Sequence, residues 1–314
     1  MNHSRPVLAL SGGIGGAKLA LGLQRATSPG TLSILVNTGD DFEHLGLLIC
    51  PDVDTTLYTL AGLSHPQLGW GRVDESWNFM SVLAQLGGES WFRLGDRDLA
   101  LHIERTRRRA TGESLTQIIA EFARCLGVPS RVLPMSDDAV RTRVHTAQGT
   151  LAFQEYFVRE RCAPVVRALE FAGADRARPS AAALECLAAP DLSAVILCPS
   201  NPYLSIDPML AMPAWRAALR RAAAPIVAVS PLIGGQAVKG PTAKIMGELG
   251  LEVSPLTVAR HYADFIDGFV LDEADGALAA KFDLPLLVTR TLMQSLEDRE
   301  RLAHACLEFA ASLG

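Results

Sequence analysis

The chain has 314 residues, 49% of them hydrophobic and 20% charged, with 29 lysines and arginines against 34 aspartates and glutamates, so that its formal net charge is -5. This composition excludes disordered, collagen-like and small disulfide-stapled proteins, and its mild acidity argues against nucleic-acid binding, which normally shows as a basic domain. No apolar run reaches the roughly 18 residues of a membrane span, and the first six residues lack a signal-peptide layout. We therefore expect a cytoplasmic protein that binds small molecules.

Strand and helix patterns alternate over the first sixty residues. Residues 7–10 form a short apolar run that ends in a cluster of glycines, residues 17–25 suit a helix, and residues 32–36 form a second β-rich run. This order is typical of a parallel sheet that is covered by helices.

The middle of the chain is predicted to be helical first and antiparallel afterwards. Apolar residues recur at helical spacing in residues 114–126, behind a capping-box sequence. Residues 141–145 and 151–158 alternate as antiparallel strands do. The run Arg-Thr-Arg-Arg-Arg at 105–109 is interpreted as a solvated helix face.

Strand-then-helix order returns in the last third of the chain. Residues 194–198 and 225–229 are predicted as buried strands, residues 208–222 as a helix, and residues 292–312 as a closing helix. A sheet built from both ends of the chain follows, since the middle interrupts the pattern.

The sequence therefore predicts an α/β fold with a Rossmann-like, mostly parallel sheet covered by helices. The absence of a low-complexity linker favours one interleaved unit over residues 1–314. Its core would comprise about 1–73 and 190–314, and an inserted helical and antiparallel cap would comprise about 74–189.

A glycine-rich loop, residues 11–18, lies between the first strand and the first helix. Glycine lets the backbone approach a ligand closely, and a helix N-terminus offers free N–H groups to an anion. The loop matches neither the P-loop pattern nor the dinucleotide fingerprint. We interpret it as a phosphate site, and a tight turn without a ligand is the alternative.

Acidic residues follow the second strand in two short stretches, 37–41 and 50–55, with two aspartates in each. They are expected at the carboxyl end of the sheet, where ligands bind in open α/β folds. Hard oxygen ligands beside a phosphate site suggest Mg²⁺. The alternative is that aspartates serve turns and caps here, with Asp52 as the N-cap of a helix at 54–60.

Three further loops contain residues that could bind a ligand. The charged turn at 91–98 could stack an aromatic side chain or an arginine on a flat heterocycle, or could simply cap the next helix. The loops at 199–202 and 230–242 are expected at the same sheet edge as the glycines. There they could supply backbone N–H groups, together with Lys239 and Gly240, to a diphosphate.

Together these segments resemble the 2-phospho-L-lactate transferase family (CofD), which acts in coenzyme F-420 biosynthesis. The resemblance runs from residue 8 to about residue 272, so it covers most of the chain. The matching stretches are residues 12–19, 37–41, 50–60, 69–71, 94–99, 199–202 and 229–241, with His261 and Tyr262.

The resemblance implies a homodimeric, magnesium-dependent transferase of substituted phosphate groups. It would move a phospho-hydroxyacid, derived from lactate, enolpyruvate or glycerate, from its guanosine diphospho-adduct to the terminal ribityl hydroxyl of the deazaflavin Fo, with release of GMP. The family's Fo-binding positions fall on Asp54 and Arg93, and its metal positions on Asp40 and Asp54, which would also be the catalytic residues. The guanosine-diphosphate side falls on Gly12, Gly13, Gly15, Gly16, Ser200 and Asn201.

Two other functions remain open at this point. A nucleotide-binding regulator of the same superfamily would keep the glycine loop but would not need residues 52–54 or 93–96. A nicotinamide oxidoreductase would want an acidic residue at the end of the second strand, where Asn37 stands.

Overall fold

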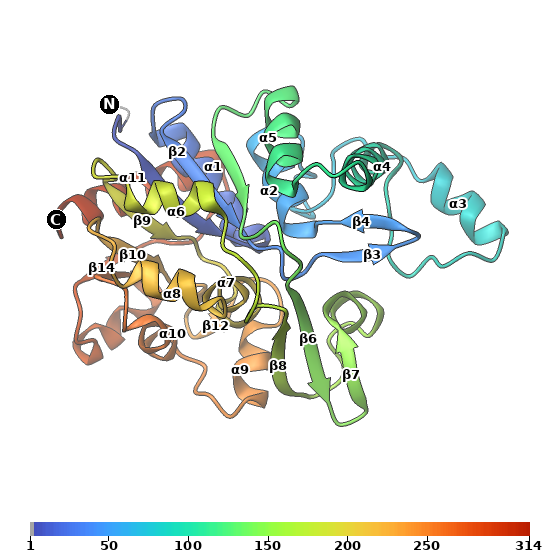
Figure 1. The fold of residues 1–314 in the computed structure, drawn as a ribbon. Coiled ribbons are helices and arrows are strands. Elements are labelled where there is room, and N and C mark those ends of the chain that lie inside the picture. Colours follow the sequence, from blue (N-terminus) through green and yellow to red (C-terminus); the bar gives the residue numbers. More distant parts are fainter. Residues whose placement is uncertain (1–2) are drawn as a thin grey trace.

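A seven-stranded parallel sheet forms the centre of the computed structural model, which describes residues 3–314 (Figure 1). Both ends of the chain contribute to it, because the first strand pairs with the second on one side and with a strand near residue 195 on the other. The predicted α/β fold is therefore confirmed. In order across the sheet, the strands are β14 (Leu286–Thr289), β13 (Gly268–Asp272), β10 (Ile226–Val229), β9 (Ala194–Leu197), β1 (Val7–Ser11), β2 (Leu32–Val36) and β5 (Arg131–Pro134).

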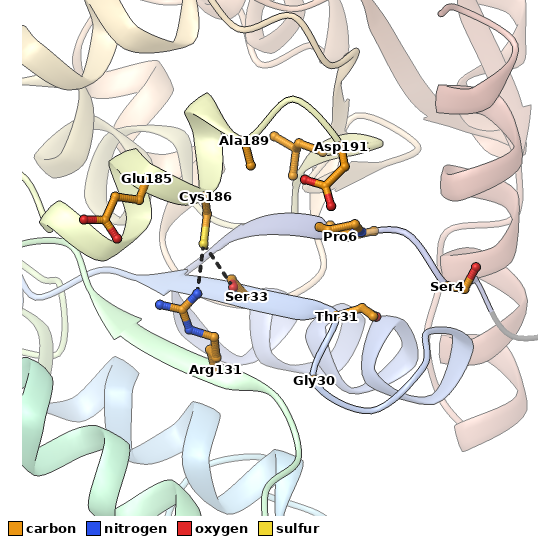
Figure 2. Close-up of a pocket in the computed structure, with 12 residues that line it drawn as sticks. Ser4, Pro6, Gly30, Thr31, Ser33, Arg131, Glu185, Cys186, Ala189 and Asp191 are labelled. Carbon is orange, nitrogen blue, oxygen red and sulfur yellow. Dashed lines mark hydrogen bonds between the residues drawn. The ribbon is translucent and has the colours of Figure 1, made fainter.

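Different residues surround the sheet where its strands begin and where they end. At the edge where the strands begin, a cavity of about 490 Å³ lies between the sheet and the segment 185–192 (Figure 2). There the Cys186 thiol lies between the Arg131 guanidinium, 3.3 Å from its Nη1, and the Ser33 hydroxyl, 3.4 Å from its Oγ. None of the predicted site residues lines this cavity. The predicted glycines follow β1, Asp40 follows β2, and Ser200 and Asn201 follow β9, all at the opposite ends of the strands.

Helices cover both faces of the sheet, and alternate strand residues pack into each layer. In β1, Val7 and Ala9 pack on one side and Leu8 and Leu10 on the other. Burial on both faces explains why the strands read as continuous apolar runs. The first layer contains α1 (Gly13–Ala26), α2 (Pro51–Leu60), α5 (Leu115–Cys125) and α11 (Leu296–Ala311); the second contains α6 (Ala181–Ala188), α7 (Asp207–Leu210), α8 (Pro213–Leu219), α9 (Thr242–Glu248) and α10 (Pro255–Tyr262).

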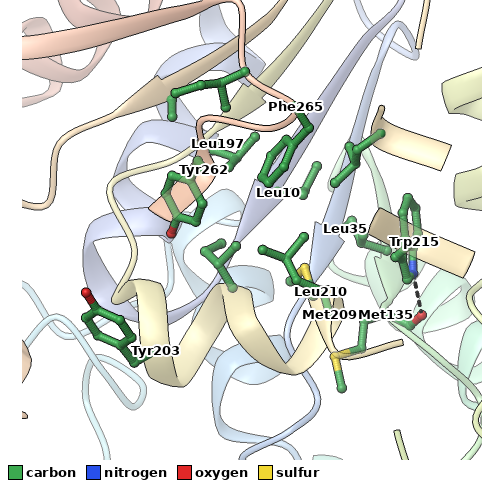
Figure 3. Close-up of a cluster of buried hydrophobic side chains, with 14 of the residues drawn as sticks. Leu10, Leu35, Met135, Leu197, Tyr203, Met209, Leu210, Trp215, Tyr262 and Phe265 are labelled. Atoms are coloured by element: carbon green, nitrogen blue, oxygen red, sulfur yellow. Dashed lines mark hydrogen bonds between the residues drawn. The ribbon is translucent and has the colours of Figure 1, made fainter. Parts of the chain in front are cut away.

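Large side chains fill the second layer (Figure 3). Leu10, Leu35 and Leu197 reach from the strands toward α7 and α8, where Trp215 is fully buried. The Trp215 indole N–H donates to the Met135 carbonyl at 3.4 Å, which satisfies its polar atom inside the core.

The remaining elements extend from the carboxyl edge of the sheet, on the right and at the bottom of Figure 1. One group lies far from both chain termini and contains the hairpin β3–β4 with α3 and α4. The other group is a three-stranded antiparallel sheet in the order β7-β6-β8. Their bounds are β3 (Phe42–His44), β4 (Leu47–Ile49), α3 (Asn78–Gln85), α4 (Asp96–Ala110), β6 (Arg141–Thr146), β7 (Gly149–Ala152) and β8 (Val166–Ala172).

The range predicted as the cap, 74–189, divides between these projecting elements and the core. β5 joins the edge of the central sheet, α5 packs in the first layer, and α6 packs in the second. The first two residues of the predicted core lie outside the described residues. Short elements complete the chain: η1 (Glu155–Arg159), η2 (Pro202–Ile206), β11 (Leu232–Ile233), β12 (Gln236–Ala237) and η3 (Glu273–Lys281).

Several element predictions need correction. The alternation at 151–158 predicts one strand, but β7 ends at Ala152 and a π-helical turn follows. The helix predicted at 208–222 is two helices, because Pro213 starts a new one at its N1 position. The capping box before α5 is confirmed. Within residues 3–314, no helix combines the length and the apolar character that crossing a membrane requires.

Candidate active site

The glycine loop after β1 presses against the loop after β9. The Gly12 amide donates to the Ser200 hydroxyl at 3.1 Å. A Cβ atom added to Gly15 would lie 2.4 Å from the Pro199 carbonyl oxygen, and one added to Gly16 would lie 2.6 Å from the Ser200 Oγ. Glycine is therefore required by this close approach, as well as by the turn.

The N-terminus of α1 has no side-chain cap from its own N-cap residue, although the Asp52 carboxylate accepts a hydrogen bond from the Gly13 amide. Gly12 is its N-cap and supplies no side-chain acceptor, and Gly13 takes a left-handed φ of 65°. The N–H groups of the first helical turn carry partial positive charge and need acceptors. Ser11 Oγ, at the end of β1, is buried without a hydrogen-bond partner among residues 3–314. These donors could together hold a phosphate group.

Three buried aspartates lie close to this loop. Burial, and then the charge of Asp52, raise the pKa of Asp40 well above its usual value, although the Asn37 side chain lowers it in part. Burial also raises the pKa of Asp52, and it raises that of Asp41 to about 7 against the opposing charge of Arg141. A cluster of this kind is unfavourable when all its members are ionised and no cation is near.

The hydrogen bonds of these aspartates are incomplete. The Asn37 amide donates to Asp52 Oδ2 at 3.0 Å, so Asp52 is not the helix cap that the sequence suggests; Cys50 occupies that position. Asp40 Oδ1 and Asp41 Oδ1 are buried without a partner in the described part of the chain. Unpartnered carboxylate oxygens are the donors that Mg²⁺ prefers, so this cluster fits a divalent cation.

Asp54 has a different environment, one turn along α2. Arg105 of α4 binds it through two parallel hydrogen bonds, Nη1 to Oδ1 at 2.6 Å and Nη2 to Oδ2 at 2.9 Å. Arg105 is fully buried, and, against the effect of burial, the charge of Asp54 raises its pKa. The interpretation of 105–109 as a solvated face is therefore wrong for Arg105, although Arg107 is exposed and pairs with Glu104.

His102 and Asp98 extend this arrangement along α4. His102 Nδ1 lies 2.8 Å from Arg105 Nη2, and its Nε2 lies 3.2 Å from Asp98 Oδ2. Donor atoms of Asp54, Asp98 and His102 lie within 4.8 Å of one another, so these three residues could also hold a metal ion. The spacing of residues 98, 102 and 105 along one helix face is the signal that sequence reasoning missed.

Arg93 lies at the surface, in the loop that precedes α4. Its guanidinium stacks over the Trp77 ring at 4.0 Å from the centroid. Trp77 and Phe92 pack against a small apolar cluster that includes Leu94 and Leu99. An exposed arginine that is steadied by an aromatic ring can meet the edge of a planar anionic ligand.

The later loops approach the glycine loop from two directions. Lys239 Nζ donates to the Leu68 carbonyl at 3.1 Å, and a Cβ atom on Gly69 would meet Ile14 of α1 at 2.9 Å. The segment around residue 69 therefore bridges Lys239 and the start of α1. Gly240, next to Lys239, has a φ of 73° that favours glycine.

Two pairs of backbone amides in the later loops already donate hydrogen bonds to side chains of the protein. The Gly234 and Gly235 amides donate to the Asp275 carboxylate at 2.8 and 2.9 Å, so they are not available to the diphosphate for which the sequence suggests them. Asn201 Oδ1 accepts from two amides of η2, while its Nδ2 is buried without a partner among the described residues. Asn201 therefore retains a donor for a ligand.

The chain is similar to known transferases over almost its full length. A model of the family described as 2-phospho-L-lactate transferase CofD matches residues 7–284. A phosphoenolpyruvate transferase of Kitasatospora aureofaciens is 40% identical over 97% of both chains. A 2-phospho-L-lactate transferase of Methanosarcina mazei is 36% identical over 96% of this chain and 99% of the relative.

A solved structure shares the fold. The crystal structure of a UPF0052 family protein from Bacillus halodurans aligns with a TM-score of 0.62 over 96% of this chain and 99% of that one. The sequence identity is 15%, so this match bears on the fold alone.

Proposed function

The chain belongs to the CofD family of transferases in coenzyme F-420 biosynthesis, and from that premise we propose the reaction that it catalyses. A phospho-hydroxyacid moves from its guanosine diphospho-adduct to the terminal ribityl hydroxyl of the deazaflavin Fo, and GMP is released. The observation that carries this proposal is that Asp52 joins the start of α1 to a group of buried aspartates, in which one oxygen each of Asp40 and Asp41 has no partner among the described residues. A diphosphate with its cation needs such a pair of sites.

The glycine loop serves the nucleotide donor. Gly12 is the N-cap of α1 and Gly13, Gly15 and Gly16 lie in its first turn, with the Gly12 amide bonded to the Ser200 hydroxyl. We assign the remaining donors around it to the diphosphate and the nucleoside: Ser200 and Asn201 after β9, and Lys239 and Gly240 after β12.

Asp40 and Asp54 are the proposed ligands of Mg²⁺. Asp40 has an unused buried oxygen and a neighbour, Asp52, whose charge a cation would offset. The Asp54 carboxylate keeps lone pairs beyond the two that Arg105 uses. The bound cation supplies neutralisation of the diphosphate charge.

The protein's part in the transfer is positioning and charge stabilisation. The bond between the β-phosphorus and its bridging oxygen breaks, GMP leaves with that oxygen, and the ribityl oxygen takes its place while its proton is released. Asp54 accepts the hydrogen bond of the ribityl hydroxyl and directs it toward the phosphorus, and Arg93 contacts the deazaflavin. Phosphoryl transfer needs little else from side chains, so a nucleophilic triad is not required.

The test is mass spectrometry of the purified protein with Fo, Mg²⁺ and the guanylated forms of phospholactate, phosphoenolpyruvate and 3-phosphoglycerate in competition. The relatives' names contain two of these acids, so the competition also identifies the donor. We expect one product with the mass of Fo plus one phospho-acid. Nucleotide binding without a product from any donor would instead support a non-catalytic regulator.

A further inference from the structure

Arg105 is placed to fix the orientation of the Asp54 carboxylate. Its guanidinium meets that carboxylate side-on through two hydrogen bonds of 2.6 and 2.9 Å, in a site from which solvent is excluded. Two parallel hydrogen bonds set the plane of a carboxylate as well as its distance. We propose that Arg105 is a positioning residue of the acceptor site and acts through Asp54. This inference rests on the proposed function, which assigns Asp54 to the acceptor hydroxyl.

The Arg105 guanidinium also forms a hydrogen bond to β4. Arg105 Nε donates to the Leu48 carbonyl at 3.1 Å, so each of its three kinds of nitrogen has an acceptor. Thr106 binds the same strand residue, because its Oγ1 accepts from the Leu48 amide at 2.8 Å. β4 is thus joined to α4 at two consecutive residues, and it leads directly into α2, which carries Asp54. The fork of Arg105 has little freedom to turn.

A polar chain continues from Arg105 along α4 and returns to α2. Arginine can only donate, so His102 Nδ1 accepts from it at 2.8 Å and the ring proton is on Nε2. Nε2 lies 3.2 Å from Asp98 Oδ2, a close charge contact without the alignment of a hydrogen bond. Asp98 accepts from the Tyr58 hydroxyl, one turn beyond Asp54 on α2. Hydrogen bonds therefore join α2 and α4 at two places one turn apart, Asp54 with Arg105 and Tyr58 with Asp98.

A stabilising role alone does not explain this arrangement. A buried ion pair contributes little net stability compared with apolar residues of the same volume. What a bidentate arginine adds is geometric definition, which a lysine of equal charge cannot reproduce. Arg105 contacts Asp54, Leu48 and His102, and none of these belongs to the glycine loop or to the loop after β9. Its effect should therefore fall on Fo and not on the nucleotide.

A double-mutant cycle tests the inference. Kinetics with Fo and calorimetry with GDP are measured for the wild-type protein, Arg105→Lys, Asp54→Asn and the double variant. We expect each single change to lower kcat/KM for Fo by more than about tenfold, with the affinity for GDP, measured without Mg²⁺ because Asp54 is also a proposed metal ligand, kept within about twofold. If Arg105 acts through Asp54, adding Arg105→Lys to Asp54→Asn should cost less than about twofold more.

The double variant and the control variants show whether Arg105 acts through Asp54. Losses that multiply in the double variant, or a parallel loss of GDP affinity, would overturn the positioning role. Arg107→Lys is the matched control, since Arg107 lies on the same helix with its side chain 62% exposed, and it should match the wild type.

Tyr58→Phe is the second variant if Arg105→Lys does not fold. It removes only the hydroxyl that binds Asp98 and should still lower kcat/KM for Fo; no effect would refute the inference. Absence of turnover by the wild-type protein would refute the proposed function, and the acceptor role with it.

Discussion

Neighbouring aspartates at this site differ in what they contact. Each oxygen of the Asp54 carboxylate accepts one hydrogen bond from Arg105, whereas Asp40 and Asp41 each keep a buried oxygen without a partner in residues 3–314. Sequence spacing groups all of them as candidate ligands, because it shows which residue types are close along the chain. It cannot show which carboxylate an arginine fifty-one positions away will bind. The spacing of residues 98, 102 and 105 therefore marks a shared helix face in the sequence, but it does not show that this face meets Asp54.

Raised carboxyl pKa values predict a pH dependence of stability. Asp40, Asp41 and Asp52 hold protons in the folded chain at pH values where the unfolded chain has lost them, so folding takes up protons between about pH 4 and pH 7. Stability of the metal-free protein should therefore fall as the pH rises through this window. Mg²⁺ added above it should raise the melting temperature.

Thermal unfolding of the wild-type protein and of Asp40→Asn, with and without a chelator, measures this effect. The wild-type melting temperature should fall by several degrees between about pH 5 and pH 8, and the variant's should fall less. Identical pH profiles for the two proteins, together with an equal response to Mg²⁺, would show that Asp40 neither titrates in this window nor binds the metal.

Helix α1 contains two tightly packed glycines, Gly16 and Gly22, whose neighbours differ. A Cβ atom on Gly16 would lie 2.6 Å from the hydroxyl oxygens of Ser11 and Ser200, within the glycine loop. A Cβ atom on Gly22 would meet the Arg299 carbonyl of α11 at 2.1 Å, where two helices pack together. Gly16→Ala should lower GDP affinity by more than about tenfold. Gly22→Ala should lower stability by about 1–3 kcal/mol with unchanged GDP affinity.

Calorimetry with GDP and thermal unfolding distinguish the two changes. If Gly16→Ala bound GDP like the wild type, the glycine loop would be a turn without a nucleotide role, which is the alternative that its sequence leaves open.

Elements with strong local signals could be predicted from the sequence. The buried strands β1, β2, β9 and β10 read as apolar runs, and the capping box marks the start of α5. The π-helical turn at 155–159 was not predictable, because Tyr156, Phe157 and Val158 are aromatic and β-branched residues typical of strands, and the contact of Tyr156 with Lys244 of α9 is distant in the sequence.

At the scale of the whole molecule, the sequence indicates a sheet built from both chain ends, and the structure bears this out. β5 was not predictable, since it is four residues long, ends in Pro134 and enters the sheet from inside the range 74–189. It pairs with β2, residues 131–134 against residues 33–36, a long-range contact that periodicity does not contain.

We expect the chain to form a homodimer, as its family resemblance implies. Phe79, Val82 and Leu86 are exposed by 37%, 53% and 80%, and their spacing places them on one face of α3. An apolar helix face of this kind suits a protein interface. Light scattering should give twice the mass of one chain, and Leu86→Glu should shift the population toward monomer. A monomeric wild-type protein would contradict the expectation.

Release of GMP from the guanylated phospho-acid that the protein uses tests the proposed reaction at its leaving group. The claim assigns the glycine loop and Asp40 to the donor, and Asp54 to the acceptor hydroxyl. GMP should appear only when Fo and Mg²⁺ are both present, in a one-to-one ratio with the Fo consumed. Its rate should fall by more than about tenfold in Asp54→Asn. GMP release without Fo, or an Asp54→Asn variant as fast as the wild type, would contradict this account.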